Sequence, residues 1–291
     1  MSTLERDELV KACGRTPLDE LQQPLKDMTG CGTFLEFRRR VLSPHAMIDP
    51  DLSLVLIDEV VWTSKTRSLA FKALMRDSTN YSLMATTRKL LYPTAASTGT
   101  ARHHLMYVSP DEVDAQGQTV RKLRSQGLAS VVAQSQEDAW ETAGYRDVTL
   151  MASAVARETL KFGQIQFQVR RSDFGGRTFW GPQGYDFDPA RSVADQGYIR
   201  QAFRRMVENG RDDGMFSQET AEALLEQSQQ IPPWLIQRVV VMTPDGQRRL
   251  LGEAVMDTRD WAARKELSPD APGYQVGLSR RRKHLEKHPL R

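Results

Sequence analysis

Two adjacent carboxylates, Asp58 and Glu59, are the residues of this sequence whose types and setting best fit chemistry. They follow residues 52–57, a nearly continuous apolar run that is typical of a strand buried on both faces of a parallel sheet. At the carboxyl end of such a strand, an aspartate can hold a water of Mg²⁺ and a glutamate can orient an attacking water. Apolar runs that end in two acids also occur as plain strand ends, and that interpretation stays open here.

A cluster of basic residues near the C-terminus is a second candidate group. Its four members are Arg280, Arg281, Arg282 and Lys283. The formal net charge of the whole chain is only +3, so the cluster concentrates positive charge at one place. Such a cluster can dock on phosphate, or it can be an ordinary solvated end.

Alternating strands and helices are expected to position these residues. Before a small, polar stretch at 94–100, which is expected to be a linker, the pattern predicts strands at 52–57 and 81–86 with a helix at 68–76 between them. After the linker it predicts strands at 104–109, 129–133, 148–152 and 164–170, and helices at 110–127 and 135–143. The expected fold class is therefore α/β, with two parallel-sheet layers side by side.

Five segments of the chain, in order, resemble motifs of superfamily 2 helicases, most closely the flaviviral and potyviral type. Asp58-Glu59-Val60-Val61 stands where that family has its DEAH or DECH box, and Ala85-Thr86-Thr87 stands where it has Ser/Thr-Ala-Thr. Residues 104–136, 145–155 and 196–214 resemble the opening of the second helicase domain and the fifth and sixth motifs. The resemblance covers residues 33–214.

This resemblance implies two RecA-like domains. Residues 1–93 would be a truncated first domain, 94–100 the linker, 101–230 the second domain, and 231–291 a C-terminal extension with a basic tail. Asp58 and Glu59 would then be a vestigial catalytic box.

The resemblance also implies roles for individual residues. Thr86 and Thr87 would couple the two domains, although they could equally cap a turn. Tyr107 and Ser109 would touch the nucleic-acid backbone, or they could be ordinary strand-end residues. Arg205 would be a vestigial arginine finger, or, with its neighbours, part of a solvated basic helix.

Several departures from the helicase pattern predict that ATP chemistry is absent. No GxxxxGK[ST] loop occurs in the sequence, so the backbone amides and lysine that cradle a triphosphate are missing. Val61 replaces the histidine of the box, and Glu208 occupies the second arginine position of the sixth motif. No cofactor is therefore expected, and Mg²⁺ and ATP would bind only if another chain supplied the loop.

The sequence thus predicts a catalytically silent, helicase-like scaffold, of viral type by resemblance, that binds single-stranded RNA or a protein. The alternatives are a portion of an active RNA helicase completed by another chain, and a structural assembly protein that reuses the fold. The absence of a long apolar stretch and of a signal-like start predicts a soluble, cytoplasmic protein without a membrane span. No metal site is expected, because the two cysteines lack metal-binding spacing.

Overall fold

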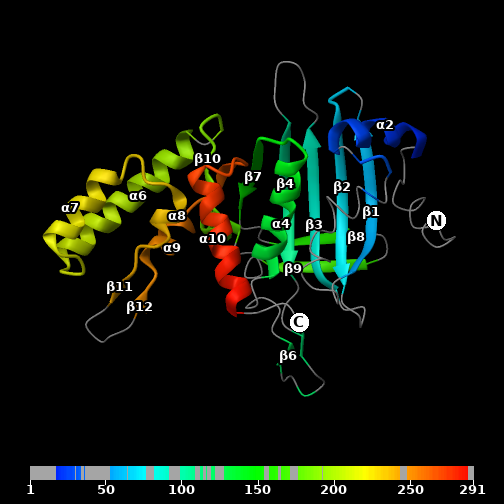
Figure 1. Ribbon diagram of the computed structural model, residues 1–291. Helices are drawn as coiled ribbons and strands as arrows, with labels where there is room; N and C mark the ends of the chain where they lie inside the picture. The colour runs from blue at the N-terminus through cyan, green and yellow to red at the C-terminus, as the bar shows by residue number, and fades with distance from the viewer. Residues whose placement is uncertain are drawn as a thin grey trace.

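The structure is a computed structural model of the 291-residue chain (Figure 1). It describes residues 18–29, 31–33, 36, 53–63, 65–76, 82–91, 99–108, 112–113, 116, 119–121, 128–153, 157–162, 165–170, 176–191, 193–242 and 248–287. Ser109 and most of the expected linker lie outside the described residues.

Seven strands form the main sheet, in the order β1-β2-β3-β4-β7-β13-β10. Their bounds are β1 Ser53–Thr63, β2 Ser68–Arg76, β3 Ser82–Leu91, β4 Thr100–Val108, β7 Asp147–Ala152, β13 Trp261–Glu266 and β10 Asp186–Phe187. Neighbouring strands in this sheet are antiparallel except β4 and β7, which are parallel. The fold is therefore mixed α/β, and its sheet consists mainly of antiparallel strands.

The strand–helix–strand crossover expected over residues 52–86 is wrong, because residues 68–76 form strand β2. Strands β1 and β2 make a hairpin whose turn holds Arg67 in the left-handed region, at φ 44°. Leu69 and Phe71 of β2 are buried while Ala70 between them is partly exposed, which is the period of two that a strand requires. Tertiary pairing on both edges of β2 overrides the helix propensity of its leucine, alanine and methionine residues.

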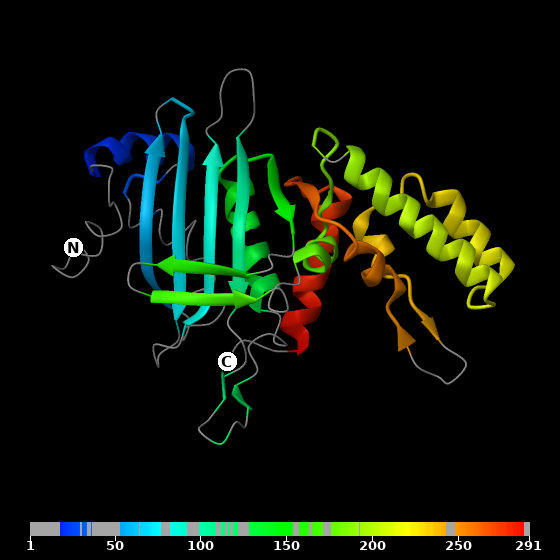
Figure 2. The same ribbon diagram turned by 180° about the vertical axis from the view of Figure 1, so that it is seen from behind.

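Two helices cover one face of the sheet, and a hairpin crosses the other face (Figures 1 and 2). The helices are α4 (Leu128–Thr142) and α10 (Pro272–Lys287), and the hairpin joins β8 (Arg157–Phe162) to β9 (Ile165–Arg170). The expected strand at 129–133 is wrong, because these residues belong to α4. The expected helix at 110–127 is wrong where it is described, because β5 (Glu112–Val113) and β6 (Thr119–Arg121) pair there as strands.

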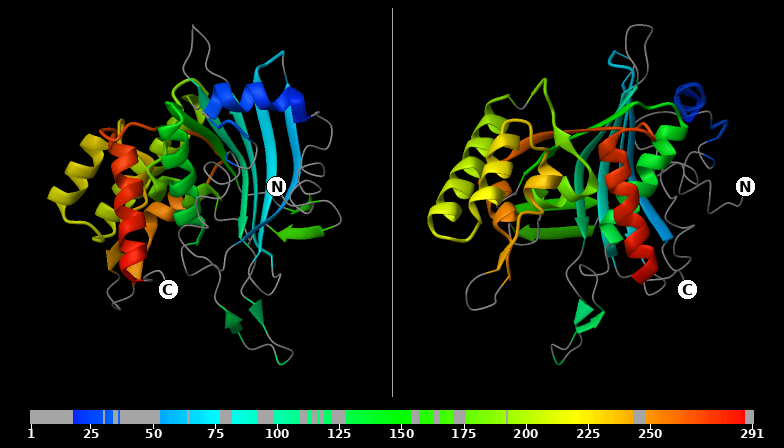
Figure 3. Two further views of the ribbon diagram at one scale, coloured as in Figure 1. Left: turned by 45° about the vertical axis from the view of Figure 1, so that its right-hand side comes forward. Right: turned by 60° about the vertical axis from the view of Figure 1, so that its left-hand side comes forward.

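The remaining described elements lie at the ends of the strands, beside β10, or in an arm that leaves the sheet (Figure 1). A short helix α5 (Gly176–Phe179) and a 3₁₀ turn η5 (Gly181–Gln183) precede β10, and helix α2 (Leu18–Thr29) lies across one end of the strands (Figure 3). Beyond β10, helices α6 (Val193–Asp212) and α7 (Gln218–Gln227) project away from the sheet as an arm. Between the arm and α10 lie α8 (Pro233–Ile236), the hairpin β11 (Val241–Met242) and β12 (Arg248–Arg249), and α9 (Leu251–Met256).

Large aromatic side chains form the core where α4, β13 and the segment before β10 meet. Trp140 of α4 and Trp261 of β13 are both fully buried, and Tyr185 lies with them. Trp180 packs against the Tyr185 ring edge to face, with 5.1 Å between ring centroids. Aromatic residues remove large apolar areas from water, so this cluster ties the helices to the sheet.

The main sheet continues across the expected domain boundary. Strand β3 precedes residues 94–100 and strand β4 begins at the last of them, Thr100, yet the two strands pair directly from Met84↔Val108 to Leu91↔Thr100. A boundary at 94–100 would therefore divide one continuous sheet.

Among the helices that the structure describes, none combines the length and the apolar character that a membrane crossing requires.

Candidate functional site

Asp58 and Glu59 lie inside strand β1 and not at its end. The strand continues to Thr63, because Val60 to Thr63 pair with the start of β2. The register shifts between Ile57 and Glu59, so Asp58 falls at an irregularity of the ladder. The expected placement of the two acids at the carboxyl end of a parallel strand is therefore wrong.

The sheet brings the expected coupling threonines close to this carboxylate pair. Glu59 of β1 and Thr87 of β3 both pair with Lys72 of β2, so they occupy one row of the sheet with a single strand between them. At the usual strand spacing their backbones are about 10 Å apart. Thr86 pairs with Met106 of β4, and Tyr107 pairs with Ala85. Glu59, Thr86 and Thr87 therefore lie in strand interiors, in the middle of the antiparallel sheet. Tyr107 is the next-to-last residue of β4, which ends at Val108. These residues do not meet at a common carboxyl edge.

The four basic residues near the C-terminus belong to helix α10, where successive side chains point in different directions. Arg281 turns toward the protein body and forms an ion pair with Asp138 of α4. Arg280 and Lys283, three positions apart, are exposed and line one groove, whereas Arg282 is exposed outside that groove. Up to Lys287, the expected basic tail is thus a helix packed on the protein, with only part of its charge available to a ligand.

The groove beside α10, called the basic groove below, combines cations from three separate segments. Its four cations are Arg238 after α8, Arg248 of β12, and Arg280 and Lys283 of α10. Glu253 of α9 is its one carboxylate, so the lining carries an excess of positive charge. The cavity measures about 340 Å³.

Trp234, Gln237 and Ser279 complete the polar and aromatic part of this lining. Trp234 of α8 is partly exposed and lines the groove, so part of its indole ring can contact a ligand. Burial lowers the pKa of Arg280, and the nearby Glu253 carboxylate acts in the opposite direction. An arginine remains protonated at neutral pH in either case.

Two glycines allow α10 to approach the body closely, and this approach fixes the wall of the basic groove. Gly184 adopts φ 89° and faces the backbone of Gly273 near the start of α10, where a Cβ would collide with the Gly273 carbonyl group. A Cβ on Gly277 would lie 2.6 Å from Lys265 Nζ and 2.9 Å from the Gln183 carbonyl oxygen. Glycine is therefore required at both contacts.

Asp138 of α4 anchors α10 by hydrogen bonds. The Tyr274 hydroxyl donates to Asp138 Oδ1 at 2.8 Å, and Gln134 Nε2 donates to the same oxygen at 2.9 Å. Together with the Arg281 ion pair, these bonds hold the basic helix against α4. Burial raises the pKa of Tyr274, and acceptance by Asp138 raises it further, so the hydroxyl stays a donor.

A buried charged network lies directly beneath this contact. Lys265 Nζ of β13 donates to Glu137 Oε2 at 2.5 Å, to Gln134 Oε1 at 3.1 Å and to the Gln183 carbonyl oxygen at 2.9 Å. The Tyr185 hydroxyl donates to Glu137 Oε1 at 2.6 Å. Both charges of this network thus have several hydrogen-bond partners, as buried charges require.

His103 of β4 stands at the edge of this network. Its Nε2 lies 3.6 Å from Glu137 Oε1, and its ring stacks on Trp180 with 5.1 Å between centroids. Burial alone would raise the pKa of Glu137, but Lys265 and His103 together lower it well below its ordinary value. His103 is therefore a buried residue of strand β4.

Arg205 lies on α6, where it is exposed. Its neighbours Arg204 and Arg211 form ion pairs with Glu208 and Asp212. This arrangement is that of a basic helix facing solvent. No group of three or more histidine, cysteine, aspartate or glutamate residues suited to a metal ion occurs in the described part of the chain.

Sequence reasoning missed two groups of residues that the structure brings together. Arg238 and Arg248 belong to the segment after residue 231, for which the sequence predicts no fold. Their positive charge is the only feature of the sequence that indicates a shared surface. Glu137 and Lys265 are 128 positions apart, and no local pattern marks their pairing.

No protein family, no curated protein and no solved structure matches this chain. Functional inference therefore depends on the geometry of the chain itself.

Proposed function

We propose that the protein is a nucleic-acid-binding scaffold whose basic groove holds the phosphate backbone of single-stranded RNA. The observation that carries the proposal is the convergence of Arg238, Arg248, Arg280 and Lys283 on one cavity with a single carboxylate. No step of this function uses Asp58 or Glu59.

The charge of the groove favours a polyanion. Lysine and arginine side chains that contact phosphates release condensed counterions, which supplies most of the free energy of sequence-independent binding. Because the four cations come from the segment after α8, from β12 and from α10, they are spread around the cavity and can contact several oxygens of one backbone. Phosphate contacts of this kind position a strand without reading its sequence.

Trp234 and the size of the cavity favour an unpaired strand over a duplex. An exposed indole face can stack on any base, and such stacking contributes about 1–3 kcal/mol per base in single-strand binding proteins. A cavity of about 340 Å³ is in the range that holds one small ligand, here one nucleotide of a longer strand.

The helicase lineage stays a prediction, and the proposal does not depend on it. A pair of RecA-like domains has parallel strands, whereas β1, β2, β3 and β4 are antiparallel to their neighbours in this order. Such a lineage would have to account for that difference. What supports RNA binding is the basic groove alone.

Single substitutions in the basic groove provide the test. Arg248→Ala and Lys283→Ala each remove one phosphate contact, so each is expected to weaken binding of a fluorescent single-stranded RNA about tenfold. Trp234→Leu should weaken binding to a similar extent, whereas Trp234→Phe, which keeps an aromatic face, should weaken it less. Fluorescence anisotropy at low salt measures the dissociation constants.

Arg204→Ala is the matched control, because Arg204 is an exposed arginine of α6 that does not line the basic groove. Its dissociation constant should equal that of the unmodified protein. Equal losses for Arg204→Ala and Arg248→Ala would show that binding follows total charge and not the groove. A duplex RNA that binds more tightly than the single strand would overturn the assignment to unpaired RNA.

A further inference from the structure

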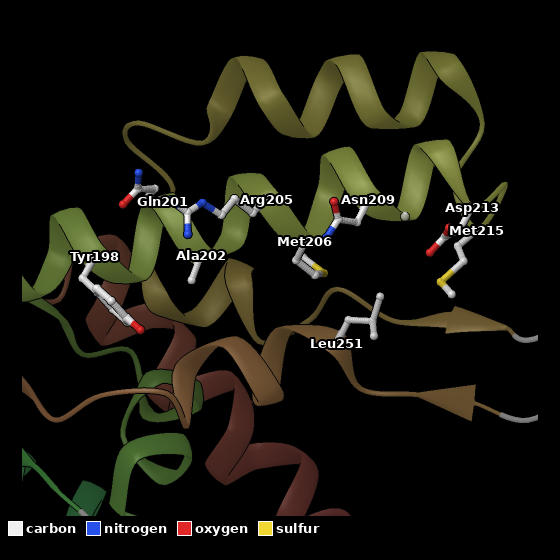
Figure 4. A pocket seen from close by; sticks show the side chains of 10 residues that line it. Tyr198, Gln201, Ala202, Arg205, Met206, Asn209, Asp213, Met215 and Leu251 are labelled. Carbon is white, nitrogen blue, oxygen red and sulfur yellow. The ribbon is translucent and has the colours of Figure 1, made fainter.

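A second groove runs along helix α6 on the side that faces α9, and it is called the arm groove below (Figure 4). Ala202, Met206, Met215 and Leu251 give it an apolar lining, and the cavity measures about 410 Å³. Arg205 and Asp213 are charged residues of opposite sign in the same lining. Figure 4 shows them at different levels along α6, with Asn209 between them.

Apolar side chains remain open to solvent in this groove. Tyr198 is 47% exposed and Met215 is 38% exposed. Grouped, exposed apolar residues with polar neighbours mark interaction surfaces, and methionine adapts readily to a partner. Because α6 and α7 project away from the sheet, another molecule can approach the arm without meeting the body (Figures 1 and 2).

The two charges of the arm groove have no ion pair with any residue that the structure describes. Their neighbours differ in this respect, because Arg204 pairs with Glu208 and Arg211 pairs with Asp212. A cation and an anion near one apolar surface therefore stay available for a partner that presents the opposite charges.

The spacing of these charges is self-complementary. Arg205 and Asn209 lie on α6, and Asp213 directly follows its last residue, with its backbone N–H donating to the Asn209 carbonyl oxygen at 2.8 Å. At intervals of four residues, Arg205 and Asp213 are about 12 Å apart along the helix axis. If two α6 helices lie antiparallel with a two-fold axis at Asn209, Arg205 of each copy comes level with Asp213 of the other. The long arginine side chain can then reach that carboxylate, and the Arg205–Asp213 pair forms twice in the symmetric assembly.

We propose that the arm groove is the interface of a two-fold symmetric homodimer, in which α6 packs antiparallel to α6 of a second copy. Two-fold interfaces use the same surface on both subunits, which is what a self-complementary pattern supplies. The apolar lining contributes burial, and the crossed Arg205 and Asp213 pairs set the antiparallel register. This inference does not rest on RNA binding.

Charge reversal tests the proposal by sedimentation velocity of the purified chain. The unmodified protein should dimerise, whereas Arg205→Glu and Asp213→Arg should each be monomeric, because like charges then oppose each other twice per interface. We expect each single reversal to raise the dimer dissociation constant at least about a hundredfold. Mixing the two single variants should restore a dimer, since Glu at position 205 of one chain then meets Arg at position 213 of the other.

The double variant Arg205→Glu/Asp213→Arg should also dimerise with itself. Glu222→Arg is the control, because Glu222 is an exposed acid of α7 outside the groove, and this variant should dimerise like the unmodified protein. Circular dichroism spectra of the variants verify that α6 is folded.

Two results would overturn the proposal. One is an unmodified protein that stays monomeric at about 100 μM, well above the micromolar dissociation constant of a small interface. The other is a mixture of the two single variants that fails to associate, since a groove made for a different protein or peptide gives no such rescue.

Discussion

At the scale of single residues, the buried pair of Glu137 and Lys265 shows how a charged contact can hold elements together. Both side chains are almost completely buried, and each has further polar partners. Removing one charge leaves the other buried without compensation, which typically costs about 3–5 kcal/mol of folding stability. The contact joins α4 to β13, so its loss weakens the packing of the helix on the sheet.

Glu137→Gln is therefore expected to lower the free energy of unfolding by about 3–5 kcal/mol at neutral pH. Urea denaturation followed by circular dichroism measures this change. Glu222→Gln, an exposed substitution on α7, should stay within about 0.5 kcal/mol of the unmodified protein. If the free energy of unfolding fell by the same small amount in both variants, the buried pair would contribute no net stability.

The same carboxylate predicts a pH dependence. Because the folded-state pKa of Glu137 lies below its unfolded value of about 4.3, the unfolded chain binds more protons in this range. The contribution of Glu137 is fully present above that pH and is lost as the pH falls toward its lower folded-state pKa. Urea midpoints measured below pH 5 should consequently fall less steeply in Glu137→Gln than in the unmodified protein. If the urea midpoints of the two proteins fell equally steeply with pH, Glu137 would not be the source of this pH dependence.

At the scale of elements, the position of α10 depends on a close contact at Gly277. A Cβ there would meet Lys265 Nζ at 2.6 Å, and Lys265 cannot withdraw without leaving Glu137. Gly277→Ala should therefore destabilise the protein by about 1–3 kcal/mol, as overpacking usually does. It should also weaken RNA binding, because Arg280 and Lys283 move with the helix.

Gly197→Ala provides a matched comparison on α6. A Cβ at Gly197 meets nothing within 4 Å, so this substitution should stabilise the helix by about 0.5–1 kcal/mol. Thermal denaturation of the two variants measures both effects. A Gly277→Ala protein as stable as Gly197→Ala would show that α10 does not need the close approach.

The elements also show which parts of the fold the sequence could predict. Strands at 148–152 and 164–170 and the helix at 135–143 were predicted correctly, because their local periodicity agrees with their tertiary setting. Strand β2 was not, since its composition favours a helix and its pairing with β1 and β3 is nonlocal. The strand predicted at 129–133 is the start of α4, where packing overrides the strand preference of the β-branched Val131 and Val132.

The candidate site was only partly predictable for the same reason. Arg280 and Lys283 were recognised as possible phosphate ligands from their local charge. Their partners Arg238 and Arg248 come from segments that approach α10 only in the folded chain. Arg281 looks equivalent to Arg280 and Lys283 in the sequence, but in the structure it forms an ion pair with Asp138 on α4.

At the scale of the whole molecule, the two proposed surfaces lie on different parts of the structure. The basic groove belongs to α8, α9, β12 and α10, whereas the arm groove lies along α6. A homodimer formed through the arms would carry two basic grooves, and one RNA strand that reached both would bind more tightly than either groove alone allows. The arm variants and the groove variants should therefore affect oligomeric state and RNA affinity separately when a short RNA is used.

The salt dependence of RNA binding tests the central claim most directly. For four phosphate contacts with a single strand, the plot of log affinity against log salt concentration should have a slope of about −3. In Arg248→Ala/Lys283→Ala, which keeps two of the four contacts, the slope should flatten to about −1.4. A slope near zero in the unmodified protein, or the same slope in both proteins, would contradict the assignment of the basic groove as the RNA-binding site.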